Sequence, residues 1–256
     1  YTLTLSQAGG LSLGANTLTL SGGGSLVSGG LTLDNASSKL VLNSITVDSV
    51  RTSLASLGLD VDNDSTVTSL TVAHTTPVSI ASSRTLSGAI TVTAGSIKLD
   101  ETGTLASTIS MSGGELDADN SSTLSGTLTQ AGNITIDVAD NKTLTYSGTA
   151  LSLGANTLTL SGGGTLSNTN AFVLNHASSK LLLNSITVGS VSTSSNSLGL
   201  DVDNDSTVSS LSVAHITPVS IAGSKILSGA ITVSAGSIKL NETGTLASTI
   251  SMSGGE

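Results

Sequence analysis

The stretch ITVTAGSIKLDETGTLAST (90–108) decides the fold, because it aligns without gaps with a segment of equal length on either side of it. The segment before it is TVAHTTPVSIASSRTLSGA (71–89), and the segment after it is ISMSGGELDADNSSTLSGT (109–127). Apolar residues return at the same places in all three segments. The members of one such row are Leu86, Leu105 and Leu124. The alignment predicts that residues one segment length apart lie directly above one another in stacked coils.

Within each segment, apolar and polar residues alternate over three to five positions, which is typical of a short strand with one buried face. The strands are separated by sequences such as GAN, AGS and DNSS, whose Gly, Asn, Asp and Ser residues favour tight corners. No window shows a sustained helical period. Three short strands in about 19 residues make one turn of a solenoid. We therefore expect an all-β parallel β-helix with about 19–21 residues per coil and neighbouring coils about 4.8 Å apart.

A longer repeat surrounds this short one. The sequence LSLGANTLTLSGGG at 11–24 returns at 151–164, and His74 in VAHTTPVSI returns as His215 in VAHITPVSI. In LSLGANTLTL the leucines are expected to point inward. About thirteen coils fit the chain at the short period. The expected divisions are one continuous solenoid over 1–256, a first repeat unit of seven coils over 11–150, and a second, incomplete unit over 151–256.

The ungapped alignment also places particular side chains next to one another. The buried pairs that it stacks are Val78 with Ile97, Ile80 with Leu99, and Val67 with Leu86. On the outer face it places Lys98 between Ser79 and Asp117. Lys98 is therefore expected to contact Asp117 in the next coil.

The composition narrows the classes of partner. The chain has one Phe, two Tyr and no Trp, which indicates a thin interior lined by aliphatic side chains. A net charge of −9 provides no cationic field for nucleic acid or anionic lipid. No apolar run approaches the roughly 18 residues of a membrane span. We expect no nucleic-acid partner and no membrane insertion. Since neither end of the sequence has the features of a capping coil, we expect the parent chain to continue in both directions or segments to join end to end.

Three stretches carry a resemblance to known proteins. They are LGANTLTLSGGGTLS (153–167), GSIKLDETGTLAST (95–108) and GGELDADNSSTLSGT (113–127). Together they resemble the β-strand repeats of bacterial autotransporter passengers and the coils of filamentous-haemagglutinin-like exoproteins. The resemblance implies a right-handed parallel β-helix, secreted or displayed on a bacterial surface, that serves adhesion or forms fibres. It implies no shared catalytic residues.

The stretch LDVDNDSTV (59–67), which recurs at 200–208, carries the candidate metal ligands. These are Asp60, Asp62 and Asp64 in the first copy and Asp201, Asp203 and Asp205 in the second. The D-x-D-x-D spacing of hard oxygen ligands suits Ca²⁺, the one cofactor that the sequence suggests. However, Ser65 occupies the glycine position of a calcium loop and Thr71 the position of its bidentate glutamate. The alternative is a solvated acidic corner with local Asx bonds.

Catalysis by a β-helix requires carboxylates and basic residues clustered on one wall. The charged residues instead change between copies: Arg51 becomes Ser192, Arg84 becomes Lys225, and Asp100 becomes Asn241. We therefore expect no enzyme, and we interpret His74 and His215 as corner residues. Outward T-x-T pairs would suit an ice-binding wall only as a regular flat ladder, which Lys98 and Asp117 interrupt.

The sequence thus predicts a structural segment of an extracellular or cell-surface fibre or adhesin stalk. Its expected partner is itself, joined end to end or as longer copies of the same repeat. The alternative is an adhesin module whose outward Ser, Thr and Asp side chains bind carbohydrate, such as surface glycans, or a host protein.

Overall fold

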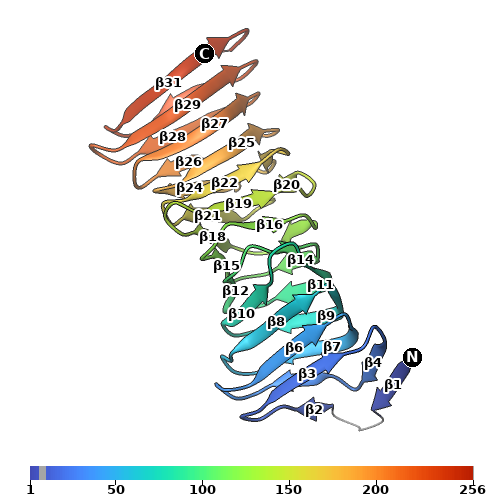
Figure 1. Cartoon of the computed structure of the whole chain (residues 1–256). Helices are drawn as coiled ribbons and strands as arrows, with labels where there is room; N and C mark the ends of the chain where they lie inside the picture. The colour runs from blue at the N-terminus through green and yellow to red at the C-terminus, as the bar shows by residue number, and fades with distance from the viewer. Residues whose placement is uncertain (6–9, 256) are drawn as a thin grey trace. The chain divides into compact units, whose positions relative to one another are not determined.

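A computed structural model describes residues 1–5 and 10–255 of the chain, and every regular element in it is a β-strand (Figure 1). The chain forms two compact units, Tyr1–Leu128 and Thr129–Glu256. The division falls inside the first sequence repeat, 11–150. In the part that is described, no helix is long and apolar enough to cross a membrane.

In the first unit, one strand from each coil joins a single parallel sheet, and six such strands mark six coils. They are β3 (Thr17–Ser21), β6 (Lys39–Asn43), β8 (Gly58–Asn63), β10 (Thr76–Ile80), β12 (Ser96–Leu99) and β15 (Glu115–Ala118). The remaining strands pair in parallel on the other walls of the coil. They are β1 (Thr2–Leu5), β2 (Leu11–Ser12), β4 (Ser25–Ser28), β5 (Leu31–Leu33), β7 (Thr46–Thr52), β9 (Ser65–Val72), β11 (Thr85–Val92), β13 (Thr104–Leu105), β14 (Thr108–Met111) and β16 (Ser122–Leu124).

The second unit repeats this plan. Its six corresponding strands are β18 (Ile134–Val138), β21 (Thr157–Ser161), β24 (Lys180–Asn184), β26 (Gly199–Val202), β28 (Thr217–Ile221) and β30 (Ile238–Leu240). The others are β19 (Thr143–Tyr146), β20 (Leu151–Ser152), β22 (Thr165–Asn168), β23 (Phe172–Leu174), β25 (Thr187–Thr193), β27 (Ser206–Val213), β29 (Ile226–Val233) and β31 (Thr245–Met252), while β17 (Leu128–Gln130) spans the division. The described chain is thus an all-β parallel β-solenoid of about twelve turns, against about thirteen expected, with about 20 residues per turn.

The interior consists of continuous rows of aliphatic side chains, as the alternation predicts. Leu86 lies opposite Leu105, and Leu105 lies opposite Leu124, in neighbouring parallel strands. All three are at most 1% exposed. The leucines of LSLGANTLTL are all buried in the second copy, where they are Leu151, Leu153, Leu158 and Leu160. In the first copy Leu13 is buried, while Leu11, Leu18 and Leu20 are half-buried. The stacking that defines the fold is therefore confirmed.

The ungapped alignment is wrong by two positions around β10. Val78 pairs with Leu99 rather than Ile97, and Lys98 lies opposite Pro77 rather than Ser79. The path from Val78 to Leu86 is two residues longer than the equivalent path from Leu99 to Leu105 in the following coil. The longer path includes the turn Ala81–Arg84, in which the Arg84 amide donates to the Ala81 carbonyl at 2.9 Å. A shift of two leaves every side chain on its own face, so the hydrophobic pattern does not register it.

The same shift changes which residue of the next coil lies opposite Val67 in β9. Val67 lies opposite Gly88, whereas Leu86 lies opposite Ser65. A register irregularity between Gly88 and Ala89 reduces the offset from 21 to 20 residues, so that Ile90 lies opposite Leu70 further along the strand. Val67 stays inside the solenoid at 2% exposure but belongs to a different row from the one predicted.

Candidate functional site

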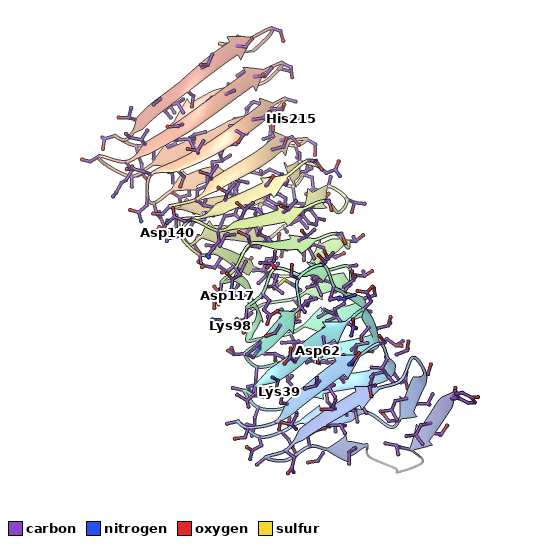
Figure 2. The ribbon with its side chains drawn as sticks, in the orientation of Figure 1. Lys39, Asp62, Lys98, Asp117, Asp140 and His215 are labelled. Carbon is purple, nitrogen blue, oxygen red and sulfur yellow. The ribbon has the colours of Figure 1, made fainter. Side chains whose placement is uncertain are left out.

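The clearest charged group on the outer face surrounds Lys98 in the first unit (Figure 2). Its Nζ lies 3.2 Å from Asp117 Oδ2 and 2.8 Å from Asp119 Oδ2. The predicted contact with Asp117 is confirmed. The contact with Asp119 was not predicted, because Asp119 lies in the corner after β15 and its side chain extends back toward Lys98. Its hydrogen bond is the main reason that the pKa of Lys98 lies above its ordinary value, and the bond to Asp117 adds to it.

A second kind of ion pair occurs once in each unit. Lys39 Nζ lies 2.6 Å from Asp60 Oδ2, and Lys180 Nζ lies 2.5 Å from Asp201 Oδ2. In both units the lysine begins one strand and the aspartate lies in the middle of the next. Because the partners lie further apart in the sequence than one segment length, the strict short period does not bring them together. Both pairs are partly exposed and link successive coils.

The six candidate calcium ligands have several separate roles. Asp60 and Asp201 face lysines. The carboxylates of Asp64 and Asp205 accept the backbone amides of Thr85 and Ile226, each at 2.9 Å. The remaining two, Asp62 and Asp203, are exposed. Among the described residues, no group of three or more His, Cys, Asp or Glu side chains could hold a metal ion. Calcium binding stays a prediction from the sequence.

Two further carboxylates have shifted pKa values, for opposite reasons. The pKa of Asp34 is lowered, first by the hydroxyl of Ser12 and then by the amide of Gly14, both of which donate to it. The pKa of Asp100 is raised, first by burial and then by the nearby charge of Asp119. Asp34 joins two coils, since Ser12 and Gly14 belong to the coil before it.

Asparagine side chains form a matching set of links where the strands end. Asn63 Nδ2 donates to Asn43 Oδ1 at 2.8 Å, and Asn204 Nδ2 donates to Asn184 Oδ1 at 2.6 Å. Each pair connects two consecutive coils at the same corner of its own unit. Sequence periodicity did not single them out, because asparagine at a corner has many local roles.

The two corner histidines lie two residues before the first residues of β10 and β28. The carbonyl of His74 accepts the hydroxyl of Thr76 at 2.9 Å, and that of His215 accepts Thr217 at 3.0 Å. Arg51, which the second copy replaces with Ser192, donates from Nε to the Thr32 hydroxyl at 3.0 Å. These contacts are local links between and within coils. The absence of an enzyme activity stays a prediction.

The fold and these links define the chain as a β-solenoid built from repeated coils. No protein-family model matches the sequence, and comparisons with curated proteins and with solved structures gave no match. The link to autotransporter passengers or haemagglutinin-like exoproteins therefore depends on the sequence resemblance alone.

Calcium is expected to leave the thermal stability of the chain nearly unchanged. Binding at Asp60 would have to displace the Lys39 ammonium, and Asp64 already accepts a backbone amide. We expect the melting temperature in millimolar CaCl₂ to equal that in EDTA. The variant Lys39→Met removes the ammonium group that faces Asp60, so it is the control in which a calcium effect on the melting temperature would be easiest to detect. A rise in melting temperature with calcium in the unmodified chain would contradict this expectation and support the calcium loop.

Replacing Lys98 with methionine is expected to lower the free energy of unfolding by about 0.5–1 kcal/mol, because partly exposed ion pairs contribute little. The raised pKa means that the folded state holds the Lys98 proton more firmly than the unfolded state. The contribution is therefore complete below pH 10.5, the ordinary lysine pKa, and is lost as the pH rises through the higher folded value. Urea titrations at neutral pH and above pH 10.5 check this. If the free energy of unfolding of the variant were lower by the same amount at every pH, the raised pKa of Lys98 in the folded state would be contradicted.

Proposed function

We propose that this chain is a structural repeat segment of an extracellular or cell-surface fibre or adhesin stalk. The observation that carries the proposal is the use of the outer polar groups. The Lys39–Asp60 and Asn43–Asn63 links join successive coils, and both recur at the same positions of the second repeat. In these links, polar side chains hold one coil to the next instead of converging on a reacting atom.

The mechanical role follows from the direction of the backbone hydrogen bonds. In each unit the bonds of the parallel sheets run from coil to coil, so a load along the stacking direction acts on many bonds at once. The apolar rows add continuous burial, and a single coil has too few buried side chains to offset its ordering entropy. Each copy of the long repeat would add seven coils, or about 34 Å of length.

The proposed partner is the same repeat, either end to end in a filament or as longer tandem copies in one chain. The lack of cysteine suits a chain that is exported unfolded through changing redox conditions. The low charge and the Ser- and Thr-rich exterior suit a solvated stalk outside a bacterial cell.

A chain lengthened by one repeat tests the spacer role. Residues 11–150 are duplicated between Ala150 and Leu151, where the sequence restarts its own cycle. Small-angle X-ray scattering should show the maximum dimension growing by about 34 Å, with an unchanged cross-section. A Gly/Ser insert with the same number of residues is the control, because it lengthens the chain without adding β-coils. Circular dichroism should show no added β-signal for this insert. A growing cross-section at constant length would overturn the spacer role.

Surface labelling tests the location. Antibodies against the chain should decorate intact, unpermeabilised cells that produce it, at fibres or at a peripheral layer. Labelling that requires permeabilisation would contradict the extracellular proposal while leaving the spacer measurement unaffected.

A further inference from the structure

Each unit has an open hollow at the corner where the strands of the shared sheet end and the next strands begin. In the first unit it crosses four consecutive coils, from Gly23 to Ser87, and has a volume of about 490 Å³. The second unit has the equivalent hollow from Gly163 to Ser228, with a volume of about 320 Å³. Both volumes lie in the range of small-ligand sites.

The hollow in the first unit presents free hydroxyl groups beside one aliphatic side chain, that of Ile45. Its lining includes Ser44, Ile45, Thr46, Asp64, Thr66 and Ser87. The backbone of this corner is satisfied: the Thr66 amide donates to the Ile45 carbonyl at 3.0 Å, and the Ile45 amide donates to the Ser65 hydroxyl at 3.3 Å. By contrast, the hydroxyls of Ser44, Thr46, Thr66 and Ser87 make no hydrogen bond within the described chain.

The carboxylate of Asp64 is held in place at this hollow. One oxygen, Oδ1, accepts the Thr85 amide at 2.9 Å, and in the second unit Asp205 accepts the Ile226 amide at the same distance. The second oxygen is left to accept a hydrogen bond from outside. Since no lysine or arginine lines either hollow, the local field disfavours an anionic ligand.

The outer faces of β7, β9 and β11 beyond the hollow form an open wall on which the two copies differ in part. Half-buried Asp48 and Thr71 become Gly189 and Ser212, and exposed Thr68 becomes Ser209, whereas Ser69 and Thr91 are unchanged as Ser210 and Thr232. In the hollow, every serine and threonine hydroxyl keeps its type except one. The retained pairs are Ser44/Ser185, Thr46/Thr187, Ser65/Ser206, Thr66/Thr207 and Ser87/Ser228, while Thr85 becomes Ile226.

We propose that each hollow binds a neutral saccharide, lying across successive coils along the stacking direction. The unpaired hydroxyls and the oriented Asp64 carboxylate would exchange hydrogen bonds with the sugar hydroxyls, and Ile45 would pack against a C–H face. This inference goes beyond the stalk role, because it gives each repeat a binding site of its own. The site in the second unit is expected to bind more weakly, since Ile226 removes one hydroxyl.

Titration of the whole chain with neutral hexasaccharides tests the inference. Cellohexaose, maltohexaose and N-acetylchitohexaose are added to about 10 mM, well above a weak Kd of about 1 mM, and followed by NMR chemical shifts and calorimetry. At least one should bind with two sites per chain, and hexagalacturonate, an anion, should not. Absence of binding by all three neutral sugars, or equal binding of the anion, would overturn the inference.

Variants of one copy at a time locate the binding. Thr46→Val with Thr66→Val keeps the β-branched shape but removes two hydroxyls, and should reduce the stoichiometry from two sites to one. The intact second hollow then serves as the internal control for folding. The matched control, Thr71→Val with Thr91→Val, alters two threonines of the open wall and should leave two sites. If the variant with Thr46→Val and Thr66→Val still bound saccharide at two sites per chain, the assignment of one site to the hollow of the first unit would be overturned.

Discussion

Replacing Gly88 with alanine is expected to lower the free energy of unfolding of the first unit by at least about 3 kcal/mol. Gly88 has a φ of +126°, which side-chain-bearing residues rarely adopt, and it lies in β11 against the preceding coil. A Cβ atom there would lie 1.8 Å from the backbone carbonyl oxygen of Val67. Because the obstacle is backbone in a parallel ladder, relief requires the two coils to move apart.

Gly22 is the matched control for this prediction. It has a similar φ of +115°, but a Cβ atom would meet nothing within 4 Å. Gly22→Ala should therefore cost only the conformational strain, about 1–2 kcal/mol. Native-state hydrogen exchange of amides in the first unit measures both variants without assuming that the two units unfold together. Equal costs would show that close approach of the coils is not what requires glycine at position 88.

The second large effect is expected from the interior row that contains Leu99. Leu99→Ala should lower the free energy of unfolding of the first unit by about 2–5 kcal/mol, the usual cost of truncating a fully buried leucine. Leu99 is 2% exposed and is stacked between Val78 and Ala118. Its removal leaves a void that coils held by backbone ladders on several walls cannot readily close.

The repeat supplies the control residue. Leu240 occupies the same place in GSIKL of the second copy, but it is 56% exposed. Leu240→Ala should change the free energy of unfolding of the second unit by less than about 1 kcal/mol. Urea titrations with residue-resolved exchange compare the two variants. Similar losses in both would contradict the burial on which the interior rows depend.

The outer face was predicted in part. The contact between Lys98 and Asp117 follows from a period that holds from β12 to β15, where the corners are equal in length. The pair of Lys39 with Asp60 was missed, because it is diagonal and depends on the side-chain reach of lysine. The hollow at Ser44 and Asp64 was missed as well, since it arises from the shape of a corner over four coils and not from any motif.

The sequence by itself determined the architecture of this protein. Alternation with a period of two, broken by Gly, Asn, Asp and Ser, is compatible only with short strands, and the recurrence of Leu86, Leu105 and Leu124 sets how coils stack. Only the tertiary structure decided the local register and with it the neighbours on the outer face. The physical reason is that a slip of two positions keeps every apolar side chain inside, so burial does not distinguish the two registers. The length and turn geometry of corners such as 81–84 make that choice.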